Sequence, residues 1–304
     1  MTRIALKIDV DTDRGTLEGV PRLAALFERL GVRATFLFSL GPDHTGRAVR
    51  RAFRRGFMGK VKRTSVLKHY GLKTLLYGTL LPGPHIGRRR GGILRDIASR
   101  GFEVGVHTYD HVKWQDGVAT APEDWTRREL VLARDQFTDI FGRGPTVHGA
   151  AGWQVNRYVP RLEQELGFSY ASDGRGTEPF VPVVAGAAFG VPQLPTTLPT
   201  LDELVGREDL NGEDPVDHLL RLTAGPSCKD QVYTLHAELE GGLFLEAFER
   251  LLRGWRGQGA ELADLATCAA ALDVSRLPRC EMLAGTVAGR SGTLAVQGPA
   301  LNYR

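Results

Sequence analysis

The chain has 304 residues, of which 42% are hydrophobic and 24% charged, a composition typical of a soluble protein with one large core or at most two domains. No apolar run approaches the roughly 18–20 residues of a membrane-spanning helix, and acids interrupt the N-terminal segment where a signal peptide would need its apolar core. The three cysteines are widely spaced, which argues against a disulfide framework or a cysteine zinc site. The net charge of +4 conceals an uneven distribution, because residues 44–95 hold 14 Lys and Arg and no Asp or Glu, whereas the rest of the chain has 25 basic and 35 acidic residues.

The N-terminal residues predict a parallel β–α–β unit. Residues 4–11, IALKIDVD, are apolar up to a cluster of acids and indicate a buried strand. Residues 19–31 place apolar side chains at helical spacing and end at a glycine, and residues 34–40, ATFLFSL, predict the next strand. A strand, a helix and a strand with short connections pair in parallel.

The alternation of strands and helices continues after the basic segment. Further strands are expected at 102–107, 146–150, 169–173 and 231–238, and helices at 91–101, 122–141, 155–166, 215–223 and 243–257. We therefore expect an α/β fold, arranged as one barrel-like domain over residues 1–272. Residues 273–304 are Gly-rich without a clear period, and we expect a poorly ordered tail there.

Acids and histidines stand at the ends of four predicted strands. They are Asp9 and Asp11, His107 and His111, Asp173, and His236. The carboxyl ends of strands in α/β sheets and barrels gather on one face, where reactive groups collect. We therefore expect these side chains to converge on one site.

Two histidines four residues apart, His107 and His111, share one side of a helical turn and suit a single metal ion. Asp9 and Asp11, two apart on a strand, point the same way, and adjacent carboxylates repel unless a cation or proton separates them. One carboxylate with two imidazoles leaves room for a water, whose proton the other carboxylate can take. The alternatives are unrelated surface histidines and a calcium-like loop, although the glycine and closing glutamate of an EF-hand are missing.

His236 follows a late strand and is placed to donate a proton to a departing amine. Glu238 and Glu240 lie close in sequence and are candidates to orient it. The alternative is a core histidine that is hydrogen-bonded to the backbone.

The order of these motifs resembles the polysaccharide deacetylase (NodB-homology) family. The resemblance covers residues 1–272 and is carried by IDVDT, EGVPRL, GVHTYDH, AAGW, SDGRG, LPTTLPT and YTLHAELEG. It implies a distorted (β/α) barrel and one divalent metal ion (zinc, manganese, cobalt or nickel). In the branch that this chain resembles most, it implies removal of a formyl group from a lipid-linked amino sugar during lipid A modification, which gives resistance to polymyxin and cationic peptides.

By position in the motifs, the resemblance also implies roles for five residues. Asp9 matches the general base and His236 the general acid, and Asp11, His107 and His111 match the metal ligands. Val10 separates two aspartates that are adjacent in the usual first motif, which is a departure from the family.

The third motif departs from the family, because residues 150–153 are Ala-Ala-Gly-Trp where an Arg and a Pro are usual. The missing Arg normally positions the base, and we hypothesise that Arg175 replaces it. The N–H groups of Ala151 and Gly152 are candidates for an oxyanion hole. Trp153 either stacks on a sugar or fills the core, and Asp173 is a further candidate for contact with substrate.

The basic segment at 44–95 is expected to be an amphipathic insertion that binds an anionic membrane surface. Its candidate membrane-binding residues are Arg50, Arg51, Phe53, Arg54, Arg55, Phe57, Lys60, Lys62 and Arg63. A solvated insertion is the alternative, and the apolar residues and the lack of a recognised nucleic-acid fold argue against nucleic acid. Together with a polyprenyl-phosphate-linked substrate, this predicts a peripheral protein on the cytoplasmic face of the bacterial inner membrane.

Overall fold

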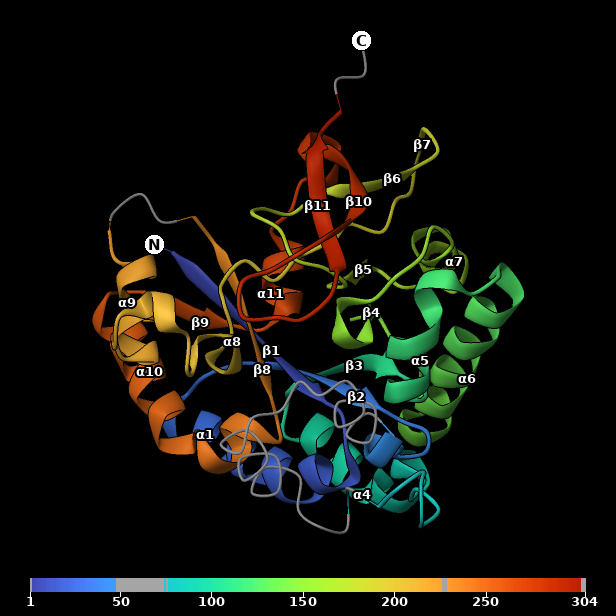
Figure 1. Cartoon of the computed structure of the whole chain (residues 1–304), viewed down its shortest axis with the longest axis horizontal. Helices are drawn as coiled ribbons and strands as arrows, with labels where there is room; N and C mark the ends of the chain where they lie inside the picture. Colours follow the sequence, from blue (N-terminus) through green and yellow to red (C-terminus); the bar gives the residue numbers. More distant parts are fainter. Residues whose placement is uncertain (1, 48–73, 75, 226–228, 302–304) are drawn as a thin grey trace.

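The computed structural model describes residues 2–47, 74, 76–225 and 229–301, and a parallel seven-stranded sheet lies at its centre (Figure 1). The strand order is β5–β4–β3–β2–β1–β8, and β9 pairs with the first residues of β1. The strands are β1 (Arg3–Val10), β2 (Thr35–Ser39), β3 (Glu103–Thr108), β4 (Val147–His148), β5 (Tyr170–Ala171), β8 (Gln231–His236) and β9 (Glu261–Ala263).

A segment without regular strand structure connects the two edges of this sheet. Leu194 N–H donates to the carbonyl of Ala171 in β5 at 2.7 Å, and Thr197 N–H donates to the carbonyl of Val232 in β8 at 3.0 Å. The ring is therefore completed by an irregular stretch, which confirms the predicted distorted (β/α) barrel.

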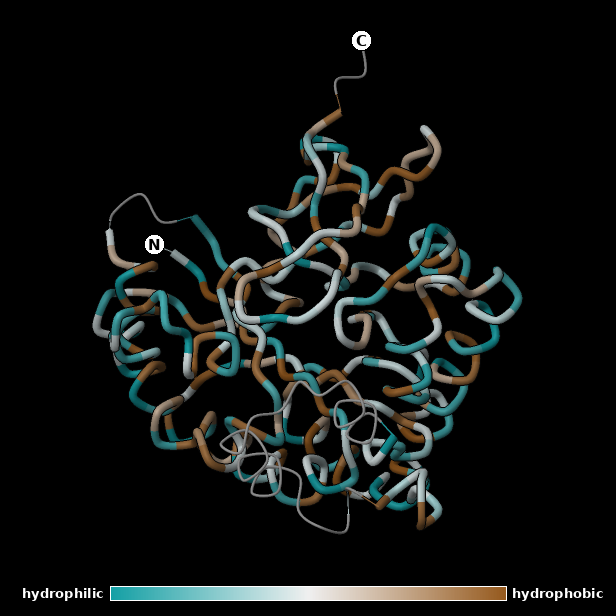
Figure 2. Tube along the Cα trace, in the orientation of Figure 1, coloured by the Kyte–Doolittle hydropathy of each residue, from teal (hydrophilic) through white to brown (hydrophobic). Residues whose placement is uncertain are grey.

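Helices surround the sheet (Figure 1). They are α1 (Val20–Leu30), α4 (Ile86–Ser99), α5 (His111–Gly117), α6 (Glu123–Phe141), α7 (Val159–Glu165), α8 (Leu201–Leu204), α9 (Pro215–Thr223), α10 (Leu245–Gly257) and α11 (Leu265–Ala270). The outer helices alternate between hydrophilic and hydrophobic residues (Figure 2), as expected for helices with one face on a core. Phe27 of α1, for example, contacts Phe36 of β2 and Phe248 of α10 edge-on, with ring centroids 6.1 and 6.0 Å away.

The alternation of side chains along β1 separates the apolar core from the interior of the barrel. Ile4, Leu6 and Ile8 pack in the core between the sheet and the outer helices, whereas Ala5 belongs to a second cluster. Since residues two apart in a strand share a face, Lys7 and Asp9 lie on the same side as Ala5. Both are buried, so β1 delivers two charged groups into the barrel.

The C-terminal residues form a β-hairpin, which corrects the prediction of a poorly ordered tail at 273–304. β10 (Arg279–Gly285) and β11 (Leu294–Ala300) pair antiparallel, and β6 (Val181–Val184) and β7 (Ala187–Ala188) extend them to a four-stranded sheet. The glycine and proline of β11 interrupt the alternation of apolar and polar residues by which a strand is predicted from sequence. Its partners are also distant in sequence: Arg175 N–H donates to Ala295 O at 2.9 Å, and Gln297 N–H donates to Arg175 O at 2.8 Å.

Most of the predicted basic insertion, including all nine candidate membrane-binding residues, lies outside the described residues. Residues 86–95 of the segment belong to α4, which begins five residues before the predicted helix start. Arg90 of α4 forms a bidentate ion pair with Asp13, with both contacts at 2.7 Å. The C-terminal end of the segment is therefore part of the barrel. Among the described residues, no helix has the length and apolar character needed to cross a membrane.

Candidate active site

Asp11, His107 and His111 converge at the carboxyl ends of the first and third strands. Asp11 follows β1 directly, His107 lies near the end of β3, and His111 begins α5. Asp11 Oδ1 lies 3.3 Å from His107 Nε2 and 3.4 Å from His111 Nε2. One ligand atom from each residue lies within 4.8 Å of those of the other two, so the structure brings the predicted triad together.

The donor chemistry of this triad fits a divalent cation. Asp11 Oδ1 is buried and has no hydrogen-bond partner among the described residues. His107 Nδ1 donates to Gly149 O at 2.6 Å, which leaves the lone pair of Nε2 facing Asp11. Burial opposes ionisation of Asp11, but His111 and His107 outweigh it and hold the pKa of this carboxyl below its usual range. Burial lowers the pKa of His111, so the site offers a carboxylate and imidazole nitrogens.

Asp9 lies next to this triad and beside a buried lysine. Its Oδ2 is 3.6 Å from Lys7 Nζ, and its Oδ1 is 3.8 Å from His107 Nδ1. Asp9 Oδ1 is buried and accepts no hydrogen bond from the described residues. Lys7 Nζ also donates to Ser172 O at 2.8 Å, which fixes the amine. Asp9 therefore has one oxygen held next to a cation and one available to accept a proton.

Arg175 is engaged elsewhere, which corrects the hypothesis that it positions the base. Its Nη1 donates to Glu203 Oε1 at 2.5 Å and its Nη2 to Leu198 O at 3.0 Å. The cation next to Asp9 is that of Lys7. The sequence held a signal for this lysine, because a charged residue inside an apolar strand, two residues before an aspartate, shares its face.

His236 ends β8 and is paired in register with Asp9 of β1. Its Nδ1 lies 4.0 Å from Asp202 Oδ1 and has no hydrogen-bond partner among the described residues. Burial alone would lower the pKa of His236, but the carboxylates of Asp202 and Asp11 raise it above its ordinary value. Asp202 was missed in the sequence because, although the motif LPTTLPT ends two residues before it, it lies in a four-residue helix and its spacing to His236 follows no local pattern.

The two acids expected to orient His236 serve the backbone instead. Glu238 Oε1 accepts hydrogen bonds from the N–H groups of Asp11 (3.1 Å) and Thr12 (2.9 Å). Glu240 Oε2 accepts from the N–H of His236 at 2.8 Å. Burial raises the pKa of Glu238 to about 8 and that of Glu240 to about 7. Glu238 thus supports the turn that presents Asp11, while Asp202 faces the imidazole.

The third motif forms a strained turn at Ala151–Trp153, directly after β4. Gly152 has a φ of 61°, a conformation that favours glycine, and a Cβ on it would lie 2.6 Å from Gln115 Nε2, so that side chain would have to move. Trp153 also has a positive φ, 52°, a conformation that costs a bulky residue on the order of 1 kcal/mol. In this turn the N–H groups of Trp153 and Gln154 donate to the carbonyls of Ala150 and Ala151 at 3.0 and 3.1 Å. A role for the N–H groups of Ala151 and Gly152 in an oxyanion hole stays a prediction.

Trp153 is 2% exposed and forms part of the wall of the site. Its Nε1 donates to Thr196 Oγ1 at 3.2 Å, and its ring meets His236 edge-on with the centroids 6.4 Å apart. Of the two alternatives for Trp153, this arrangement favours filling the core, because the ring is too buried to stack on a sugar.

Asp173 lies behind this turn in a buried network, which corrects its prediction as a substrate contact. Its Oδ1 accepts from Ala150 N–H at 2.8 Å and lies 3.0 Å from His148 Nδ1, which also lies 2.6 Å from Glu163 Oε1. Burial opposes protonation of His148, but Asp173 and Glu163 raise its pKa to about 10. His148, Glu163 and Asp173 are close enough to hold an ion. A protonated imidazole has no lone pair for a metal, so we interpret the network as structural.

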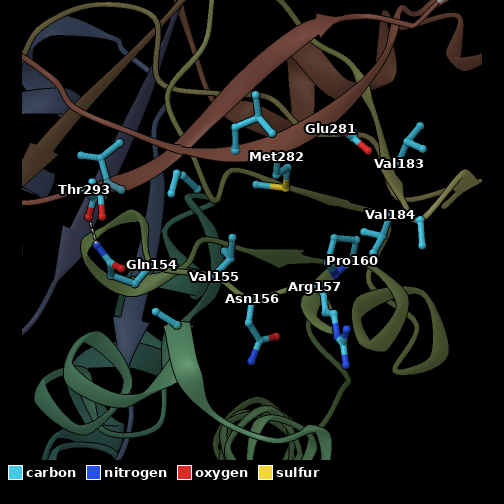
Figure 3. A pocket seen from close by; sticks show the side chains of 16 residues that line it. Gln154, Val155, Asn156, Arg157, Pro160, Val183, Val184, Glu281, Met282 and Thr293 are labelled. Carbon is cyan, nitrogen blue, oxygen red and sulfur yellow. Dashed lines mark hydrogen bonds between the residues drawn. The ribbon is translucent and has the colours of Figure 1, made fainter.

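A cavity of 370 Å³ opens between the hairpin and the segment after Trp153 (Figure 3). Val155, Pro160 and Met282 are among the residues that line it, and Gln154 Nε2 donates to Thr293 O at 2.6 Å at its edge. None of the predicted catalytic or metal-binding residues lines this cavity. It marks the junction of the hairpin and the barrel, away from the metal ligands.

Comparison with known proteins agrees with this geometry. The family model described as polysaccharide deacetylase matches residues 10–171. A Shewanella sediminis protein described as a probable 4-deoxy-4-formamido-L-arabinose-phosphoundecaprenol deformylase, ArnD, is 33% identical over 99% of this chain and 97% of its own length. A Wigglesworthia glossinidia brevipalpis protein with the same description is 30% identical over 93% of this chain and 98% of its own. A solved polysaccharide deacetylase structure from Mycobacterium smegmatis shares the fold, with a TM-score of 0.62 at 18% identity, over 94% of this chain and 96% of that one.

Proposed function

The chain belongs to the polysaccharide deacetylase family and is a hydrolase of amide bonds, and from this premise we propose that it is a metal-dependent deformylase. The proposed substrate is undecaprenyl-phosphate-linked 4-deoxy-4-formamido-L-arabinose, and the proposed setting is lipid A modification. The observation that carries the proposal is the convergence of Asp11, His107 and His111 within 4.8 Å. Similarity to the two curated relatives over nearly the full chain supports the choice of substrate.

A divalent cation held by Asp11, His107 and His111 would supply a Lewis acid that acidifies water and stabilises negative charge on the amide oxygen. In the proposed reaction Asp9 Oδ1 takes a proton from the attacking water, while Lys7 holds the other oxygen of the carboxylate.

His236 gives a proton to the amine nitrogen as the C–N bond breaks, and the products are formate and the free amino sugar. Because Asp202 faces Nδ1 of this imidazole, Nε2 is the atom available to the substrate. The raised pKa of His236 favours the protonated form that an acid requires.

We further propose that the protein works peripherally at the cytoplasmic face of the inner membrane, where its lipid-linked substrate would lie. The charge of residues 44–95 supports contact with anionic lipid. Within the described part of this segment, Leu76, Leu80 and Leu81 are 37%, 79% and 38% exposed. Exposed leucines beside basic residues are typical of an interfacial surface.

Release of formate from a synthetic formamido-arabinose polyprenyl phosphate tests the substrate assignment. The matched control is the acetamido analogue of the same lipid. Faster release of formate than of acetate supports a deformylase, and faster release of acetate supports the alternative, a deacetylase of another N-acylated sugar. No release from either lipid, together with retained binding to vesicles, would support a non-enzymatic lipid-binding module.

A further inference from the structure

The C-terminal hairpin reaches the candidate site through Arg290, which lies between β10 and β11. Arg290 Nε donates to Glu203 Oε1 at 2.9 Å, and its Nη2 lies 3.2 Å from Asp202 Oδ2. Its guanidinium carbon is 4.7 Å from the centroid of the Trp153 ring, a favourable distance for a cation–π contact. One side chain of the hairpin thus contacts both the carboxylate that faces His236 and the tryptophan beside it.

The hairpin is docked on both sides of Arg290. Gly289 has a φ of +84°, and a Cβ on it would lie 2.3 Å from Glu203 O, so only glycine permits this approach. On the other side, Thr293 O accepts from Gln154 Nε2 at 2.6 Å, and Ala295 O accepts from the N–H of Arg175 at 2.9 Å. These contacts fix the backbone that carries Arg290.

Asp202 is held from two directions. Its Oδ1 accepts a hydrogen bond from Thr200 Oγ1 at 2.6 Å and faces His236 Nδ1 at 4.0 Å, while its Oδ2 faces Arg290. Burial would raise the pKa of Asp202, but Arg290 and His236 lower it overall, so the group is a carboxylate. Arg290 contacts a second acid, Glu203, and is therefore matched by carboxylates within the protein.

We infer that the C-terminal hairpin is part of the active site and that Arg290 is a positioning residue, which holds Asp202 opposite His236. Arg290 acts through Asp202 on the imidazole. The family model matches residues 10–171. Proton donation by His236 would then depend on the hairpin, which lies outside that matched region. The inference rests on the proposed role of His236 as the general acid.

A double-mutant cycle in the full chain tests this inference. We expect Arg290→Gln and Asp202→Asn each to lower kcat by about 10-fold or more, because each leaves the acid poorly oriented. Their combination should lower kcat little further, since the two residues act in one chain of contacts. KM and metal content should stay near wild type, and Arg290→Lys should restore part of kcat. The matched control is Arg276→Gln, at an exposed arginine of the same C-terminal segment.

The inference would be overturned if the fold-reductions in kcat of the two single variants multiplied in the double variant. An unchanged kcat in Arg290→Gln would overturn it as well. A second readout does not depend on turnover of any particular substrate. In protein labelled at the histidine rings, Arg290→Gln should shift the NMR signals of His236, and Arg276→Gln should not. Unshifted His236 signals in Arg290→Gln overturn the inference, whereas absence of turnover in the wild type counts against the proposed function alone.

Discussion

Three carboxylates at the site have different surroundings, and these surroundings suit each of them to a different proposed role. Asp11 lies between two imidazole nitrogens, at 3.3 and 3.4 Å. Asp9 lies beside Lys7 with one oxygen that accepts no hydrogen bond from the described residues. Asp202 Oδ1 lies 4.0 Å from His236 Nδ1. The first suits a metal ligand, the second a base and the third a partner of the acid.

Replacement of the two β1 aspartates should separate catalysis from metal binding. Asp9→Asn removes the proposed base, and kcat should fall by about 10²- to 10⁴-fold while the metal content is retained. Asp11→Asn should lose both activity and metal. Steady-state kinetics and metal analysis of the same preparations measure both effects, and an active Asp9→Asn protein would contradict the role of Asp9 as base.

Lys7 should matter for the orientation of Asp9 and little for substrate binding. Lys7→Met removes the buried cation 3.6 Å from Asp9 Oδ2. Because small misplacements of catalytic groups are costly, kcat should fall by about 10²-fold, with KM nearly unchanged and partial rescue in Lys7→Arg. A rise in KM at constant kcat would show instead that Lys7 contributes to binding.

Sequence patterns identified residues that stand in motifs and missed those that act through the fold. Asp11, His107 and His111 were predictable because they stand in short motifs at the ends of strands. The expected helical turn is wrong, since His107 lies in β3 and His111 begins α5. Asp202 and Arg290 have no such spacing, and they reach the site only through a short helix and a distant hairpin. Arg175 was misassigned because its partner, Glu203, is equally invisible in the sequence.

At the scale of elements, a buried network supports the turn that follows β4. Asp173 accepts from the N–H of Ala150, and the protonated His148 lies between Asp173 and Glu163. His148 holds the pKa of Asp173 at about 2 against its burial, and burial raises the pKa of Glu163 well above its ordinary value. A charged pair and a neutral acid therefore anchor the strained residues beside the metal ligands.

The network predicts a pH-dependent stability. The pKa of His148 is about 10 in the folded chain, above its ordinary value of 6.5. Its contribution is therefore complete below pH 6.5 and is lost as the pH rises through 10. His148→Gln leaves the buried carboxylate of Asp173 without its cationic partner, and the free energy of unfolding should fall by about 3–5 kcal/mol at pH 6.

Urea unfolding at pH 6, 8 and 10 measures this prediction. The difference between wild type and His148→Gln should shrink as the pH rises. His218→Gln, at a partly exposed histidine of α9, is the matched control and should show a small difference at every pH. A His148→Gln protein as stable as the wild type at pH 6 would contradict a charged network.

At the scale of the whole molecule, the barrel was predictable and its completion was not. The regular alternation of strands and helices follows from local periodicity, and the helices around 20–30, 123–141 and 245–257 lie where that periodicity placed them. The closing segment around Leu194–Thr197 and the hairpin β10–β11 depend on partners far away in the sequence. No local pattern encodes such pairing.

The whole protein should bind membranes through both charge and apolar contact. In vesicle flotation with anionic lipid, 1 M salt should release only part of the protein, and detergent should release all of it, because salt screens the basic residues but not the leucines. Leu80→Ser, at an exposed position, should make binding more sensitive to salt. Recovery of all the protein in the soluble fraction at low salt would contradict membrane binding.

The most direct test of the cation site is the metal content of the purified full-length protein, measured together with amide hydrolysis. The wild type should carry one divalent ion per chain and lose hydrolysis when a chelator removes it. His107→Ala and His111→Ala should lose the ion, and His218→Ala, far from the triad in sequence, should keep it. Hydrolysis that continues at the full rate in protein stripped of metal would contradict the proposed chemistry.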